Sequence, residues 1–307
     1  MIPIISRVNW RSLLPGQVSE LCTFDMAAGK VRVIHRSSHA VLEAPNWTPD
    51  GQWLVVNSAG SLYRVAVHGG DPPERIPLGS LCDVNNDHVI SPDGATIYVS
   101  SEGDGHVYSA PLSGGEPTRL SADRVGPFGY FVIGISPDGH TLAVTGAEAR
   151  EGRDFVSSLF TMPAAGGVAT PLPDDNSDGD SVGCAYSPDG AWLYFSSESG
   201  SAQRGRTQVL RMRPDGSGRQ QLTDGASADW FPKPSPDGAW VVYLAFAPGT
   251  IGHASNVVVR LCAMRPDGSH QRTLHELLGG QGTMNVTSWS PKGDRFAFMA
   301  YPIGETP

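Results

Sequence analysis

The sequence predicts an all-β fold made of one repeated unit. Three observations lead to this prediction: a high content of turn residues, a phrase that recurs six times, and a second glycine turn in most copies. The 307 residues include 37 Gly and 25 Pro, about one residue in five, which disfavours long helices. A hydrophobic fraction of 39%, with 7 Trp, 8 Tyr and 10 Phe, can build a core and excludes a disordered chain.

The recurring phrase is Ser-Pro-Asp-Gly followed by an apolar strand, with Thr in the first copy and Lys for Asp in the last. The six copies begin at Thr48, Ser91, Ser136, Ser187, Ser235 and Ser290. Proline presets the backbone for a turn, aspartate closes the turn through its side chain, and glycine accepts positive φ. Each copy therefore predicts a tight hairpin.

A second hairpin follows about twenty residues after the first, as an alternating strand that ends in a glycine turn. Examples are SLYRVAVHGG, HVYSAPLSGG and SLFTMPAAGG. Two hairpins give four strands per unit, and four-stranded units at this period form the blades of a β-propeller. Six copies predict a six-bladed propeller.

The two ends of the chain complete the last blade in this interpretation. The sixth unit stops after two strands, whereas the residues after Gly16 form a further hairpin, ELCTFDM-AAG-KVRVIH. This hairpin would supply the two outer strands of the sixth blade and cover edges that would otherwise be exposed. Residues 1–307 are therefore expected to form a single domain.

The repeated turns resemble those of the TolB-like six-bladed propellers, which are related to WD-type repeats, over residues 19–300. This resemblance implies the fold but not the function, because the family includes periplasmic translocation proteins, propeller domains of peptidases and oligogalacturonate lyases. The peptidase branch lacks its catalytic half here, because no G-x-S-x-G motif or hydrolase domain is present.

Composition limits the partners and the location. The 22 basic and 31 acidic residues give a net charge of −9, which argues against a nucleic-acid partner. No apolar run is long enough to span a membrane, and the first twenty residues lack the pattern of a signal peptide, so we expect a soluble cytoplasmic protein. Four widely spaced cysteines predict free, mostly buried thiols.

Strand connectivity assigns the loops to two faces. Both kinds of hairpin turn fall on one face, which we expect to be scaffold. The loops between the second and third strands, and the crossings between blades, fall on the other, which we call the top face. These loops are longest in blades 3 to 5, and long loops on a rigid scaffold often carry function.

The crossings to the top face are rich in amides, carboxylates and aromatic rings. A central pocket rimmed by them would suit a small polar, carbohydrate-like ligand. The candidate ligand-binding residues are Glu43, Asn85, Asn86, Tyr130, Asp180, Trp230, Gln281 and Asn285. Alternatively, Glu43 and Asp180 are solvated or cap a turn, and Trp230 packs between blades.

His88 and Asp87 are the candidate catalytic residues, because they belong to a polar run just before a predicted inner strand. His88 would act as a general base oriented by Asp87 in a lyase or hydrolase. Otherwise His88 is a hydrogen-bonded structural histidine, or a ligand of a divalent metal ion with His253 and Gln281. The resemblance to oligogalacturonate lyases suggests that metal set, although Lys233 would place a positive charge beside it.

Two functions of different class remain open. The first is an enzyme or binding protein for a carbohydrate-like molecule. The second is a non-catalytic scaffold whose blade 3 to 5 loops hold a protein partner.

Overall fold

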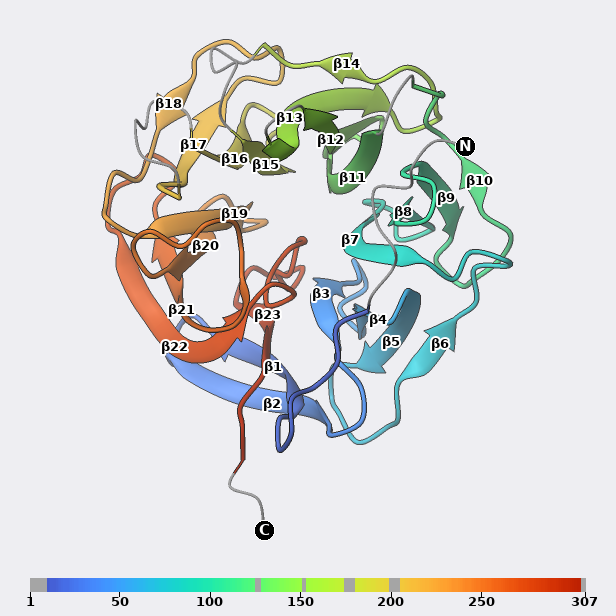
Figure 1. The fold of residues 1–307 in the computed structure, drawn as a ribbon. Helices are drawn as coiled ribbons and strands as arrows, with labels where there is room; N and C mark the ends of the chain where they lie inside the picture. The colour runs from blue at the N-terminus through green and yellow to red at the C-terminus, as the bar shows by residue number, and fades with distance from the viewer. Residues whose placement is uncertain (1–9, 125–127, 151–152, 174–179, 199–204, 305–307) are drawn as a thin grey trace.

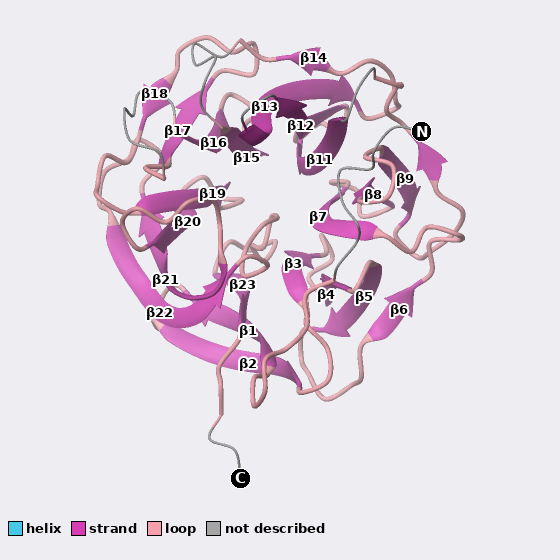
Figure 2. Ribbon diagram, in the orientation of Figure 1, coloured by secondary structure: helices cyan, strands magenta, loops and turns pink. Residues whose placement is uncertain are grey.

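A computed structural model describes residues 10–124, 128–150, 153–173, 180–198 and 205–304. Six antiparallel sheets surround one axis (Figure 1), and the described residues form strands and loops without a helix (Figure 2). The predicted all-β, six-bladed β-propeller is confirmed. No helix in this part of the chain is long and apolar enough to cross a membrane.

The strands follow one another along the whole described chain. In order they are β1 (Ser19–Asp25), β2 (Lys30–Ser37), β3 (Glu43–Trp47), β4 (Trp53–Ser58), β5 (Ser61–Ala66), β6 (Glu74–Ile76), β7 (Val84–Ile90), β8 (Thr96–Ser101), β9 (Val107–Pro111), β10 (Thr118–Arg119), β11 (Phe128–Ile135), β12 (Thr141–Arg150), β13 (Arg153–Pro163), β14 (Thr170–Pro171), β15 (Ser181–Tyr186), β16 (Leu193–Ser197), β17 (Gln208–Met212), β18 (Gln220–Gln221), β19 (Ala228–Pro234), β20 (Val241–Phe246), β21 (Ser255–Met264), β22 (Arg272–Gly280) and β23 (Arg295–Ala300).

Blades 1 to 5 are four-stranded sheets in chain order, from β3–β6 to β19–β22. The inner strands β3, β7, β11, β15 and β19 lie nearest the axis in Figure 1. Blade 6 has the order β2-β1-β23, and an isolated bridge between Trp289 and Phe296 adds its innermost segment. Because β1 pairs along β23, from Glu20–Ala300 to Asp25–Arg295, the N-terminal hairpin closes the ring as predicted.

The repeated turns are held by one hydrogen-bond pattern. In blade 4, Ser187 Oγ donates to Asp189 and accepts from the Trp192 N–H at 2.9 Å, while Asp189 also accepts from the Ala191 N–H at 3.0 Å. Gly190 in the same turn has φ 70°, a conformation that favours glycine. All these turns connect first to second strands, so they lie on the predicted scaffold face.

Neighbouring blades pack through apolar side chains and are tied by polar ones on their second strands. Ser100 Oγ accepts from the Val132 N–H at 2.8 Å, and Ser196 Oγ accepts from the Phe231 N–H at 3.0 Å. Each bond joins one blade to the inner strand of the next. These bonds fix β11 and β19 to the blade that precedes each of them.

Every one of the five inner strands contains a β-bulge near its middle. In β3, β11, β15 and β19 the bulge adds one residue relative to the second strand, and it is accompanied in β3 and β19 by positive φ at Ala44 and Phe231. In β7 it adds two, because residues 85–87 lie opposite Ser100 alone. Bulges redirect side chains, so blade 2 carries an unusual segment at the axis.

The four cysteines are free thiols, as predicted. Cys22, Cys184 and Cys262 are buried, and Cys82 is exposed.

Candidate functional site

The double bulge of β7 places Asp87 beside residues from two distant blades. Asp87 Oδ1 accepts a hydrogen bond from Asn285 Nδ2 at 3.4 Å, and the carboxylate interacts electrostatically with Lys233 of β19. Lys233 in turn interacts with Cys184 of β15. We call Asp87, Cys184, Lys233 and Asn285 the axial cluster.

Lys233 is the least ordinary member of the axial cluster. Its side chain is 0% exposed, and among the described residues its Nζ has no hydrogen-bond partner. The carbonyl of Lys233 accepts a hydrogen bond from Trp289 Nε1 at 2.9 Å, which fixes the backbone of this residue. A buried ammonium group without acceptors is costly, and this cost makes Lys233 a candidate functional residue.

Burial shifts the pKa values of Asp87 and Lys233 in opposite directions. It raises the pKa of Asp87 to about 7, against the opposing influence of Lys233 and Asn285. It lowers the pKa of Lys233 to about 8, against the opposing influence of Asp87. Both groups therefore titrate close to neutral pH, as groups that transfer protons often do.

His88 lies between blades 1 and 2. Its Nδ1 contacts the Asn86 carbonyl at 3.0 Å, and its ring lies against the backbone of Val55 on β4. Its own carbonyl accepts from Asn46 Nδ2 at 3.1 Å. Burial lowers the pKa of His88 to about 4, so the imidazole is neutral at pH 7. These contacts do not join the ring to the Asp87 carboxylate.

The other two predicted metal ligands lie together on the top face. The centre of the His253 ring lies 5.1 Å from that of Trp230 and 5.2 Å from that of Phe231. The same ring lies beside the Gln281 side chain. Within the described ranges, no three His, Cys, Asp or Glu side chains lie close enough to hold a metal ion. The predicted set of His88, His253 and Gln281 contains only two side chains of these kinds, so it stays a prediction.

Trp230 is buried in the core formed with blade 6, at 4% exposure. This location corresponds to the packing alternative for that residue. Asn85 pairs with Glu102, and its Oδ1 accepts from the Asp87 N–H at 2.7 Å, which stabilises the bulge. Asn86 is also buried, and its Oδ1 has no hydrogen-bond partner in the described part of the chain.

Glu43 at the start of β3 is paired with Arg11, a residue that the sequence did not identify. Arg11 Nη1 lies 3.3 Å from Glu43 and donates to the Gln281 carbonyl at 2.7 Å, and Nη2 donates to Asn256 at 2.9 Å. The guanidinium also lies 3.9 Å from the centre of the Tyr301 ring. Residues 10–17 thus cover part of the top face beside blades 5, 6 and 1.

Asp180 belongs to the crossing that leads into blade 4. Its Oδ1 accepts from the Ser157 N–H at 2.9 Å, and its carbonyl accepts from the Glu198 N–H at 3.1 Å. Asp180 therefore joins blade 3 to blade 4. Residues 151–152 and 199–204 of the long top-face loops lie outside the described residues.

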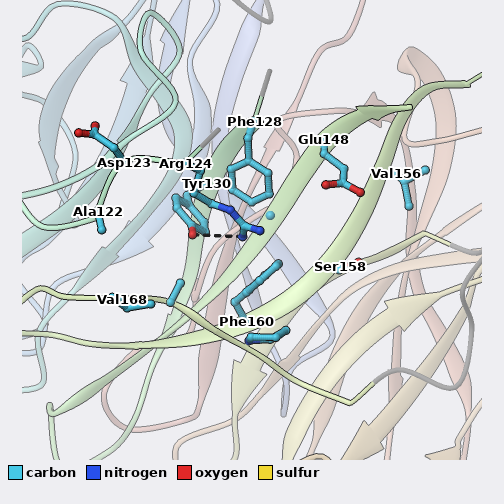
Figure 3. Close-up of a pocket in the computed structure, with 13 residues that line it drawn as sticks. Ala122, Asp123, Arg124, Phe128, Tyr130, Glu148, Val156, Ser158, Phe160 and Val168 are labelled. Atoms are coloured by element: carbon cyan, nitrogen blue, oxygen red, sulfur yellow. Dashed lines mark hydrogen bonds between the residues drawn. The ribbon is translucent and has the colours of Figure 1, made fainter. Parts of the chain in front are cut away.

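Tyr130 lies away from the axial cluster, in a groove on blade 3 with a volume of about 480 Å³ (Figure 3). The groove is lined by side chains of β11, β12 and β13 and by the crossing that precedes β11. The predicted pocket residues thus lie in several places: in the axial cluster, in the top-face contacts of Arg11 and His253, and in this blade 3 groove.

Comparisons with known proteins identify similar sequences and similar structures. No family model matches the chain. An uncharacterised protein of Agrobacterium fabrum is 39% identical over 286 residues, which is 92% of each chain. The solved structure of a "putative TolB" from Agrobacterium tumefaciens is 38% identical, with a TM-score of 0.84, and the match covers 93% of this chain and 99% of that one.

More distant similarities share the architecture. The Tol-Pal system protein TolB of Francisella tularensis is 25% identical over 288 residues, 90% of this chain but 60% of that protein. A solved oligogalacturonate lyase in complex with manganese is 12% identical, with a TM-score of 0.53 over 84% of this chain and 67% of that one, which shows a common fold alone. Its fold, its turn repeats and its similarity to the two Agrobacterium proteins establish that the chain belongs to the TolB-like family of six-bladed β-propellers.

Proposed function

We propose that the axial cluster binds a small, hydroxyl-bearing molecule of the carbohydrate type. The observation that supports this proposal is Lys233, whose fully buried Nζ lacks a hydrogen-bond partner among the described residues although Asp87 interacts with it electrostatically. A ligand group between these two side chains would satisfy both.

A hydroxyl group suits this environment because it both accepts and donates hydrogen bonds. Lys233 offers only donors, Asp87 offers acceptors, and Asn86 Oδ1 is a further acceptor without a partner in the described ranges. The opposite charges of Lys233 and Asp87 already balance, so a neutral ligand would bury no net charge. Asn86 and Asp87 are 6% and 8% exposed, so both residues are buried, as Lys233 is.

Any lyase or hydrolase reaction would depend on Asp87 and Lys233 in this proposal. Their pKa values lie near 7 and 8, where one group can accept a proton and the other can donate one. His88 would keep a structural role, because its ring is held by Asn86 and Val55. The proposal includes no metal step.

Binding of neutral mono- and disaccharides, measured by isothermal titration calorimetry, tests the proposal. We expect saturable binding by the unaltered protein and at least a tenfold loss in Lys233→Met, which removes the buried donor. Lys292→Met is the matched control, because Lys292 is exposed on the scaffold face, and it should bind normally. No saturable binding by any sugar, or equal affinity in Lys233→Met, would refute the proposal.

A further inference from the structure

The blade 3 groove differs from the axial cluster in chemistry as well as in position. Its volume is about 480 Å³, and its walls combine aromatic rings with a small number of polar side chains (Figure 3). Small-molecule sites commonly show this combination of an apolar wall and convergent polar groups. The lining includes Arg124, Phe128, Tyr130, Glu148, Ser158 and Phe160.

Three rings form a continuous aromatic wall. Phe128 and Tyr130 lie edge to face with their centroids 4.7 Å apart, and Phe160 lies 6.1 Å from Phe128 and 6.0 Å from Tyr130 at nearly right angles. Gly146 permits this packing: a Cβ there would lie 2.5 Å from Phe128 Cζ and 2.6 Å from Phe160 Cε2. The wall is therefore set by the sequence of β11, β12 and β13.

Arg124 places a positive charge on this wall. Its guanidinium carbon lies 4.0 Å from the centre of the Phe128 ring and 5.2 Å from that of Phe160. One nitrogen donates to the Tyr130 hydroxyl at a long 3.4 Å, and within the described ranges Arg124 forms no ion pair. The neighbouring Asp123 is paired instead with Arg119 and with His106 at 3.6 Å.

A guanidinium stacked on a ring presents a fork of N–H donors, which matches the two oxygens of a carboxylate. Tyr130 and Phe160 are buried, whereas Phe128 is half-buried and can contact a second ring beside the guanidinium. Across the groove in Figure 3, Glu148 and Ser158 lie on the far side from Tyr130. A polar substituent on the ligand ring could hydrogen-bond there, away from its carboxylate.

We propose that the blade 3 groove is a second binding site, for a small aromatic carboxylate that carries a hydroxyl substituent. The carboxylate pairs with Arg124, the ring packs against Phe128, and the hydroxyl faces Glu148 and Ser158. This site is independent of the axial cluster, with which it shares no lining residue.

Titration calorimetry with 4-hydroxybenzoate and with its neutral analogue 4-hydroxybenzamide tests the proposal. The two probes share the ring and the hydroxyl, so their difference reports the carboxylate. We expect the acid to bind at least tenfold more tightly than the amide. Equal affinity for the two probes, or no binding of the acid at millimolar concentration, would overturn the proposal.

Two substitutions assign the site. Arg124→Gln should reduce binding of the acid by about tenfold or more and leave the weak binding of the amide unchanged. Arg64→Gln is the matched control, because Arg64 also stacks on a ring, 4.5 Å from the centre of Trp53, but lines a different groove. An Arg124→Gln variant that unfolds at the same temperature as the unaltered protein and binds the acid equally well would exclude this site.

Lys233→Met separates the two proposals. Binding of 4-hydroxybenzoate should be unchanged in this variant even if sugar binding is lost. If the acid is lost as well, the acid binds at the axial cluster and the blade 3 assignment is wrong.

Discussion

The scaffold-face turns and the inner strands repeat with the same period, but they differ in how far their residues and contacts repeat. In four turns, the serine hydroxyl accepts the N–H of the fifth following residue at the same distance of 2.9 Å, and the serines are Ser91, Ser136, Ser187 and Ser235. Two residues before the turn, by contrast, the six units carry Asn46, Val89, Gly134, Ala185, Lys233 and Ser288. The turns preserve one interaction, whereas the inner-strand position changes its chemistry from blade to blade.

The reason lies in what each position contacts. The hydrogen bonds of a turn serine stay within its own hairpin, so the same residue type solves the same local problem in each of these turns. An inner-strand residue contacts other blades: Asn46 donates to the His88 carbonyl, and a Cβ on Gly134 would lie 2.5 Å from the Cys184 carbonyl. The repeated turn residues therefore specify the fold of the ring, whereas the varied inner-strand residues determine the chemistry along its axis.

The largest expected effect concerns the pH dependence of stability. It compares Asp87 at the axis with Asp93 in the turn of the same blade. The ordinary pKa of Asp87 is near 3.8 and its folded value is about 7, so between these pH values the folded state keeps a proton that the unfolded state has released. Stability from this group therefore falls as pH rises from 4 to 7. Asp87→Asn should remove this fall, which amounts to at most about 4 kcal/mol.

Urea denaturation at pH 3.0, 4.5, 6.0 and 7.5 measures the effect. The groups that act on Asp87 are Lys233, Asn285, Glu102 and Glu43, and Asp87→Asn leaves all of them in place. Asp93→Asn should show the opposite sign, because the Ser91 hydroxyl lowers the pKa of Asp93 and that stabilisation is lost as pH falls below 4. Parallel stability profiles for Asp87→Asn and the unaltered protein would contradict the prediction.

The next effect concerns the cost of the buried ammonium group. At pH 6, where Asp87 is largely protonated, Lys233→Met should stabilise the fold by about 2 kcal/mol, because methionine fills a similar volume without a charge. Lys292→Met, on the exposed turn of blade 6, should change stability by less than about 0.5 kcal/mol. Denaturant unfolding measures both, and a destabilised Lys233→Met at pH 6 would show that the lysine supports the fold.

The fold was predictable from the sequence because its turns are local, and the site was less so because it is assembled between blades. The Ser-Pro-Asp-Gly phrases and the hairpin after Gly16 identified six blades and the closure of the ring. The polar run at Asp87 and His88 pointed to blade 2, but which side chain faces the axis depends on the double bulge of β7. A register shift of this kind leaves no local signal.

Two further residues illustrate the same limit. Lys233 stands where the neighbouring units carry small residues, and this difference is visible in the sequence. The metal hypothesis considered Lys233 only as a positive charge that would disfavour a metal ion. Arg11 lies 32 residues from Glu43 and 245 from Asn256, and these contacts exist only after the ring has closed. Such long-range polar contacts are therefore visible in the structure and not in the sequence.

The smallest effect tests whether the scaffold turns are interchangeable. Ser187→Ala removes the acceptor for the Trp192 N–H and the donor to Asp189, and it should cost about 1 kcal/mol. Ser235→Ala breaks the same two bonds in blade 5 and should cost the same within about 0.5 kcal/mol. Ser113→Ala, at an exposed loop position, is the control. If the two turn variants differ by more than about 1 kcal/mol in denaturant unfolding, the turns carry blade-specific roles, and the contrast with the inner strands weakens.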